Sequence, residues 1–138
     1  MDPQQIVVST AGHAAALWTG LNLLLLLVLS LLVVRQRRAH KVMICDEGVP
    51  ELVRASRAFG NAVEYVPVCL VGLAVLAAVG APALLIHALG GALFIGRAAH
   101  AVGLSRSAST SPGRAIGTLF TWIVMLATGV LLVIFSAP

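Results

Sequence analysis

Charged residues are scarce in this sequence. They make up only 10% of its 138 residues, while 59% of the residues are hydrophobic. A soluble domain carries about 25% charged residues, so the composition excludes an ordinary soluble domain and is typical of an integral membrane protein. Cysteine is scarce too. Cys45 falls in a predicted loop and Cys69 in a predicted helix, so no disulfide is expected, and Cys69 is interpreted as a small core residue.

Long runs without charge predict the membrane spans. Residues 14–34 and 115–138 carry no charge, and residues 62–96 carry only Glu64. The last run has 35 residues, too many for one span of about 20, and Pro82 supplies a helix break within it. We therefore predict an all-α fold, an integral membrane four-helix bundle. The prediction is one domain over residues 1–138, with helices near 10–35, 51–79, 82–105 and 113–136.

The distribution of positive charge predicts the orientation in the membrane. Lysine and arginine concentrate in or beside the first loop (Arg35, Arg37, Arg38, Lys41, Arg54, Arg57) and flank the third (Arg97, Arg106, Arg114). The positive-inside rule then places loops 1 and 3 in the cytoplasm and both termini outside. This asymmetry explains the pI near 10.1 better than nucleic-acid binding, so no nucleic-acid partner is expected. The positive face favours anionic membrane lipid or an anionic substrate.

A stripe of polar residues enters the second predicted helix. Arg57, Asn61 and Glu64 follow helical spacing, so their side chains fall on one face, with Arg54 and Tyr65 beside them. A charged stripe in an apolar segment is costly unless it faces protein or a ligand. We interpret it as a ligand site; the alternative is a structural ion-pair network. Arg54, at the water boundary, is expected to be a structural or lipid-contacting charge.

Polar residues of the other helices are expected near the same depth. Arg97 and His100 are i,i+3 neighbours, and Arg97 is predicted to neutralise Glu64. His100 is either a donor to a ligand or a polar group at a helix end. Arg114 opens the fourth helix, where the helix dipole disfavours a cation, so an anion in a pocket is expected beside it. No metal site is expected, because this cluster lacks a set of metal ligands.

Two spaced motifs carry a family resemblance: Arg54-x-x-Arg57-Ala-x-x-Asn61-x-x-Glu64-Tyr65-x-Pro67 and Gly96-Arg97-x-x-His100-x-x-Gly103. Together with the length, the four spans and the basic first loop, they resemble the MAPEG family, the membrane-associated proteins in eicosanoid and glutathione metabolism. The chain looks closest to the short bacterial members, and the resemblance covers nearly all four helices. It implies an inner-membrane homotrimer that binds glutathione between subunits near the cytoplasmic side.

The resemblance also implies roles for individual residues. Glutathione-binding positions correspond to Arg57, Asn61, Glu64, Tyr65, Arg97 and His100. Arg38 resembles the arginine that stabilises the thiolate in the leukotriene synthase branch, and Arg114 resembles the helix 4 arginine of the prostaglandin synthase branch. The implied function is a glutathione-dependent transferase or peroxidase for lipophilic electrophiles. A nearby arginine would lower the pKa of the glutathione thiol from its ordinary value of about 8.5.

Departures from the family pattern keep other functions open. Leu104 stands where a tyrosine is expected, Ala115 replaces a serine, and Phe59 stands where eukaryotic members often have a polar residue. Tyr65 is the chain's single tyrosine. One alternative is a non-catalytic lipid-binding or scaffold homologue, and another thiol in place of glutathione is also open. A small multidrug-type transporter is a further alternative, but its glutamate lies in the first helix, where this chain has no acid.

Overall fold

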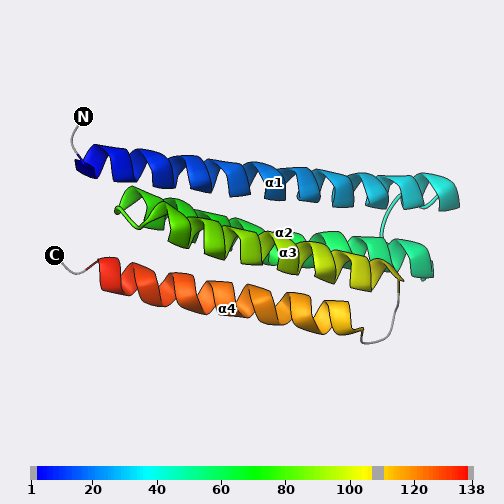
Figure 1. The fold of residues 1–138 in the computed structure, drawn as a ribbon. Coiled ribbons are helices and arrows are strands. Elements are labelled where there is room, and N and C mark those ends of the chain that lie inside the picture. Colours follow the sequence, from blue (N-terminus) through cyan, green and yellow to red (C-terminus); the bar gives the residue numbers. More distant parts are fainter. Residues whose placement is uncertain (1–2, 107–110, 137–138) are drawn as a thin grey trace.

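The computed structural model describes residues 3–106 and 111–136, and nearly all of these residues are helical (Figure 1). The four helices are α1 (Pro3–His40), α2 (Pro50–Ala78), α3 (Ala83–Arg106) and α4 (Pro112–Phe135). Each contains a stretch long and apolar enough to cross a membrane. The predicted all-α, four-span architecture is confirmed.

Helix α1 ends later than predicted, at His40 rather than near residue 35. Its last turn carries Arg37 and Arg38, whose positive charge suits the negative end of a helix dipole. The backbone then closes in a Schellman motif, in which Val42 N–H donates to Arg37 O (3.0 Å) and Lys41 adopts φ 57°. Val42 is buried, which fixes the path of the chain into loop 1.

The predicted break at Pro82 is a second Schellman motif. Gly80 adopts φ 87°, a conformation open to glycine at no steric cost, and Ala81 N–H donates to Leu76 O (3.0 Å). Ala81 is fully buried. Pro82 directly precedes α3, and its carbonyl accepts from Leu85 N–H and Ile86 N–H in the first turn of that helix. The turn between α2 and α3 is therefore short and well packed.

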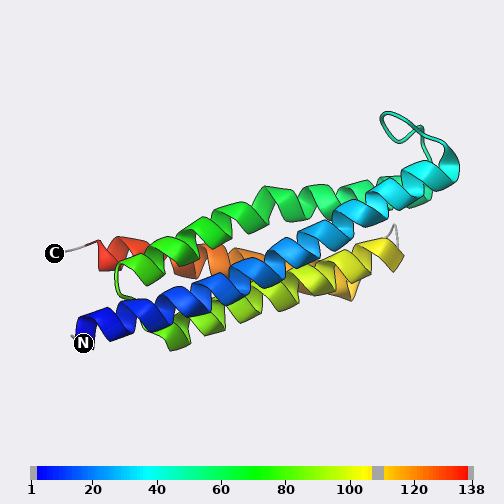
Figure 2. The ribbon, with the colours of Figure 1, turned by 90° about the horizontal axis from the view of Figure 1, so that it is seen from above.

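Helices α2 and α3 form the middle of the bundle, with α1 on one side of the pair and α4 on the other (Figure 1). Loop 1, the last turn of α3 and the first turn of α4 lie at one end of the bundle (Figure 1). The first turn of α1, the last turn of α4 and the α2–α3 turn lie at the other end (Figures 1 and 2). The ends of α1 and α3 and the starts of α2 and α4 therefore lie at the same end of the bundle.

Two apolar clusters form the core. The cluster toward the α2–α3 turn includes Leu73, Ile86 and Leu93, and the one toward loop 1 includes Ala62 and Ala101. On α3, Arg97 lies between Leu93 and Ala101, one turn from each. A buried arginine therefore separates the two apolar clusters.

Helices α3 and α4 approach each other closely at two glycines. A Cβ atom on Gly96 would lie 2.8 Å from Phe120 Cβ, and one on Gly117 would lie 2.6 Å from His100 Cβ and 2.8 Å from His100 N. Small residues of this kind let helix backbones pack closely in a membrane. The close approach brings the Gly117 carbonyl within reach of side chains on α3.

Adding a methyl group at this contact is expected to destabilise the bundle. Gly117→Ala would push α4 away from His100, and overpacking of this kind costs about 1–3 kcal/mol. Thermal unfolding of the purified protein in detergent measures the effect. Gly129→Ala in the same helix is the matched control, because no heavy atom lies within 4 Å of its added methyl. An equal loss of stability in both variants would contradict the close packing at Gly117.

Candidate functional site

A polar cavity of about 560 Å³ lies at the end of the bundle that carries loop 1. It is lined by one loop 1 residue and by side chains of α2, α3 and α4. The lining residues are Asp46, Val53, Arg54, Ser56, Arg57, Gly60, Asn61, Glu64, His100, Leu104 and Arg114. Three sequence-distant helices thus contribute to one site.

Five of the residues predicted for the site line this cavity, namely Arg57, Asn61, Glu64, His100 and Arg114. The three residues of the polar stripe on α2 therefore face one cavity. Ala58 and Ala62 lie on a different side of the same helix and are buried in the core. Three other predicted residues, Arg38, Tyr65 and Arg97, are not among the lining residues.

Arg97 is buried, with only 2% of its surface exposed. Its Nη1 donates to Asn61 Oδ1 at 2.8 Å, and its Nη2 donates to Gly117 O at 3.2 Å. Its guanidinium carbon lies 5.6 Å from the centroid of the Tyr65 ring, a cation–π distance. Arg97 therefore ties α3 to both α2 and α4, and Tyr65 supports it from behind the cavity wall.

The predicted ion pair between Arg97 and Glu64 is not formed. Within the described ranges, the structure has one ion pair, between Arg54 Nη2 and Glu51 Oε1 at 3.0 Å. Glu64 follows Asn61 by three residues, so it lies about 60° further around the helix axis, and its side chain is exposed. The close approach of α3 and α4 holds Arg97 toward Gly117 and the amide of Asn61. The ion pair with Glu64, which was predicted from charge alone, was therefore wrong.

His100 and Arg114 bring α3 and α4 to the cavity. His100 is buried, with 7% exposure, and it packs against Gly117. Arg114 lies in the first turn of α4, where Ser111 is the N-cap and its Oγ accepts from Arg114 N–H at 3.4 Å. Leu104, one turn beyond His100, adds an apolar patch to the lining.

Sequence reasoning missed Asp46 and Ser56 and gave Arg54 only a boundary role. Asp46 reaches the cavity because loop 1 turns tightly: its Oδ1 accepts from Gly48 N–H at 3.2 Å, and both Cys45 and Glu47 have positive φ. The Ser56 hydroxyl is buried with no partner in the described part of the chain. Ser56 directly precedes Arg57 of the stripe, and this position could have indicated that it reaches the cavity. No pattern in the sequence indicated that loop 1 brings Asp46 there.

Arg38 lies apart from this cavity. It is exposed in the last turn of α1. Its neighbour Arg37 donates from Nη1 to Cys45 O at 2.9 Å, which holds loop 1 against the end of α1. A role for Arg38 at the cavity of its own chain has no support in this arrangement.

The lining groups suit a small ligand that carries both signs of charge. Arg57 and Arg114 are cationic and Asp46 and Glu64 are carboxylates. No cysteine lines the cavity; Cys69 is buried in the apolar core, and Cys45 is exposed in loop 1. In residues 3–106 and 111–136, no group of three or more His, Cys, Asp or Glu side chains is placed to hold a metal ion.

Sequence comparison identifies the family of this chain. The family model for MAPEG matches residues 15–134, a range that contains every residue of the cavity. The chain belongs to the MAPEG family. It is 36% identical over 112 residues to the inner membrane protein YecN of Escherichia coli K12. The aligned residues cover 81% of this chain and 84% of YecN. YecN of Escherichia coli O6:H1 matches equally well.

No solved structure matches this MAPEG protein significantly. The four apolar helices and the relationship to an inner membrane protein together support a multi-pass inner membrane protein.

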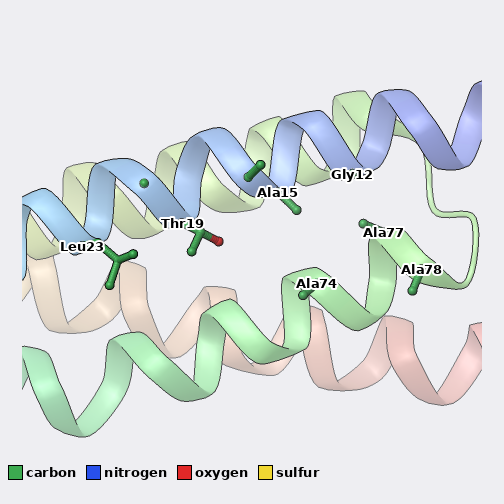
Figure 3. Close-up of a pocket in the computed structure, with 9 residues that line it drawn as sticks. Gly12, Ala15, Thr19, Leu23, Ala74, Ala77 and Ala78 are labelled. Carbon is green, nitrogen blue, oxygen red and sulfur yellow. The ribbon is translucent and has the colours of Figure 1, made fainter.

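A second cavity, also of about 560 Å³, lies between α1 and α2 toward the end opposite the polar cavity (Figure 3). Thr19 and Leu23 point toward it from α1, and Ala74 and Ala78 face it from α2 (Figure 3). Its lining is made of small and apolar residues and includes no ionisable group. The polar cavity is thus the one of these two that is lined by ionisable residues.

Proposed function

We propose that this protein is a membrane-bound, glutathione-dependent transferase or peroxidase that acts on lipophilic electrophiles. The observation that supports it most strongly is the polar cavity, in which Arg57, Asn61 and Glu64 of α2 meet His100 of α3 and Arg114 of α4. Membership of the MAPEG family supports the same proposal.

The groups of glutathione match those of the cavity. Glutathione has two carboxylates, one ammonium group and a thiol. Arg57 and Arg114 would bind carboxylate or thiolate, and Glu64 would bind the ammonium group. A nearby guanidinium favours the thiolate, which is the nucleophilic form. The ligand thus supplies the sulfur nucleophile that the cavity lacks, and the protein supplies orientation and charge.

The proposed chemistry has two forms. In transfer, the thiolate sulfur forms a bond to an electrophilic carbon, and the bond to the leaving group breaks with its electron pair. In peroxide reduction, two glutathione molecules are oxidised to a disulfide while one hydroperoxide is reduced to an alcohol and water. The electrophile would enter from the bilayer, and Leu104 and Val53 would offer it apolar contact.

Glutathione binding to the purified protein, measured by isothermal titration calorimetry, tests the proposal. We expect saturable binding to the wild type and a loss of about tenfold or more in affinity for Arg57→Ala and Arg114→Ala, since hydrogen bonds to charged groups are worth about 1.5–3 kcal/mol. Arg35→Ala is the matched control, because Arg35 is exposed on α1 and outside the cavity lining. Absence of binding to the wild type would overturn the proposal.

A second function, non-catalytic binding of lipid, is favoured by one observation. Leu104 lines the cavity at the position where a catalytic tyrosine is expected, and no tyrosine is among the lining residues. Assays of conjugation and of hydroperoxide reduction separate the two functions. Glutathione binding with turnover that falls in Arg38→Ala and Arg114→Ala supports the enzyme. Glutathione binding without turnover of either substrate class supports the binding protein.

We also propose that the protein is a homotrimer whose sites lie between subunits, so that Arg38 of one chain serves the cavity of its neighbour. The groove in Figure 3 supports self-association, because Gly12, Ala16 and Gly20 repeat every four residues along an exposed face of α1. Small residues at this spacing let another helix approach closely.

Native mass spectrometry of Gly20→Leu tests this assembly. The added side chain would fill the groove, so we expect the trimer to dissociate to smaller species. Gly129→Leu on α4 introduces the same side chain at a position that is exposed and has no neighbour within 4 Å, and it should remain trimeric. A monomeric wild type would contradict the proposal.

We propose that the protein has the membrane orientation predicted from its positive charges, with loops 1 and 3 in the cytoplasm. Cys45 is exposed in loop 1 and Cys69 is buried, so one thiol reports on loop 1. A membrane-impermeant maleimide should label the protein in inverted vesicles and leave it unlabelled in intact spheroplasts. Cys45→Ser should abolish the labelling. Labelling in spheroplasts would reverse the orientation.

A further inference from the structure

The buried cation Arg97 has neutral partners only. The two oxygens that it contacts belong to the Asn61 amide and the Gly117 carbonyl, at 2.8 and 3.2 Å, and its Nε atom has no partner in the described part of the chain. The Gly117 oxygen also accepts from Thr121 Oγ1 at 2.9 Å. A buried charge without a counter-charge is costly, so the orientation of these neutral groups is held strongly.

The contact determines which way the Asn61 amide points. An arginine side chain has donors and no acceptor, whereas an asparagine side chain has one acceptor oxygen and one NH2 donor group. The Asn61 oxygen must therefore face Arg97. A reversed amide would place its NH2 group against the guanidinium, donor against donor. Asn61 also lines the polar cavity, so its remaining polar group, Nδ2, is the one available to a ligand.

We infer that Arg97 is a positioning residue: it acts through Asn61, whose NH2 group it turns toward the cavity as a fixed donor. The contribution to glutathione binding rests on the proposed function, whereas the amide orientation does not. This wall of the cavity then selects an acceptor, either a carboxylate or a thiolate. The ammonium group of the ligand is directed instead toward the carboxylate of Glu64, which also lines the cavity.

The Asn61→Asp variant tests separately the oxygen of Asn61, which contacts Arg97, and its NH2 group, which faces the cavity. The aspartate keeps an oxygen for Arg97, so the melting temperature should stay equal to that of the wild type or rise. It replaces the NH2 donor with an oxygen, so glutathione affinity should fall about tenfold or more. Asn61→Ala loses both groups and should lower both quantities. If Asn61→Asp lowers the melting temperature as much as Asn61→Ala does, the inference is overturned.

Removing Arg97 tests the orientation itself. Arg97→Met frees the amide to rotate, so the preference for glutathione over its diethyl ester should shrink, whereas a purely structural defect would weaken both ligands alike. The Asn61 side-chain NH2 signals, assigned by their absence in Asn61→Asp, should shift in a nitrogen-15 NMR spectrum of Arg97→Met. Arg97→Lys, which keeps a charged donor, should restore the ligand preference in part. Arg35→Met is the matched control and should leave the preference and the signals unchanged.

The outcomes distinguish this inference from the proposed function. If the wild type does not bind glutathione, the proposed function fails, and the NMR signals and melting temperatures still decide the orientation of Asn61. If Arg97→Met leaves the NH2 signals and the ligand preference unchanged, Arg97 does not position Asn61. If Arg97→Met does not fold, Arg97→Lys decides by the same two measurements, and Asn61→Asp decides by its melting temperature and its glutathione affinity.

Discussion

The rest of this bundle depends on the guanidinium of Arg97, which joins three helices at one point. It donates to Asn61 on α2 and to Gly117 on α4, while its own helix, α3, is flanked by the two apolar clusters. In a bilayer, apolar surfaces do not drive helices together, because the lipid is as apolar as the side chains. Directional contacts and close packing therefore set the register, and the glycine contact between α3 and α4 lets one side chain span all three helices.

The same constraint shapes the cavity. Arg97 contacts both Asn61 and the ring of Tyr65, and Arg57, Asn61 and Glu64 line the cavity. The polar residues of α2 therefore divide into a part that holds the helices together and a part that faces the cavity. Helix α1 contributes none of the residues that line this cavity. Its basic end and loop 1 instead supply Asp46 and bring Arg37 and Arg38 to the same end of the bundle.

Local patterns carried most of the fold, and three-dimensional contacts decided the rest. The four helices and the break at Pro82 follow from runs of apolar residues and from proline chemistry, which act within a few residues. The stripe on α2 follows from helical spacing alone. The partner of Arg97 depends on how α3 is rotated against α2 and α4, which one sequence does not specify, so charge suggested Glu64 where the structure has a neutral amide. Asp46 depends on positive φ angles in loop 1, which no residue type there demands.

The absence of an acid beside Arg97 changes the electrostatics of the site. Arg54 pairs with Glu51, Arg57 and Arg114 line the cavity together with Asp46 and Glu64, and Arg97 contacts the amide of Asn61. Had Arg97 paired with Glu64, that carboxylate would have been engaged by a guanidinium of its own chain, with no change in the net charge of the site. With Arg97 bound to a neutral amide instead, Arg97 does not engage Glu64, which lines the cavity. Guanidinium groups close to a bound thiol would favour its deprotonated form. The neutral pairing of one buried arginine thus leaves carboxylates and guanidinium groups together in the cavity, as the proposed binding of a zwitterionic thiol requires.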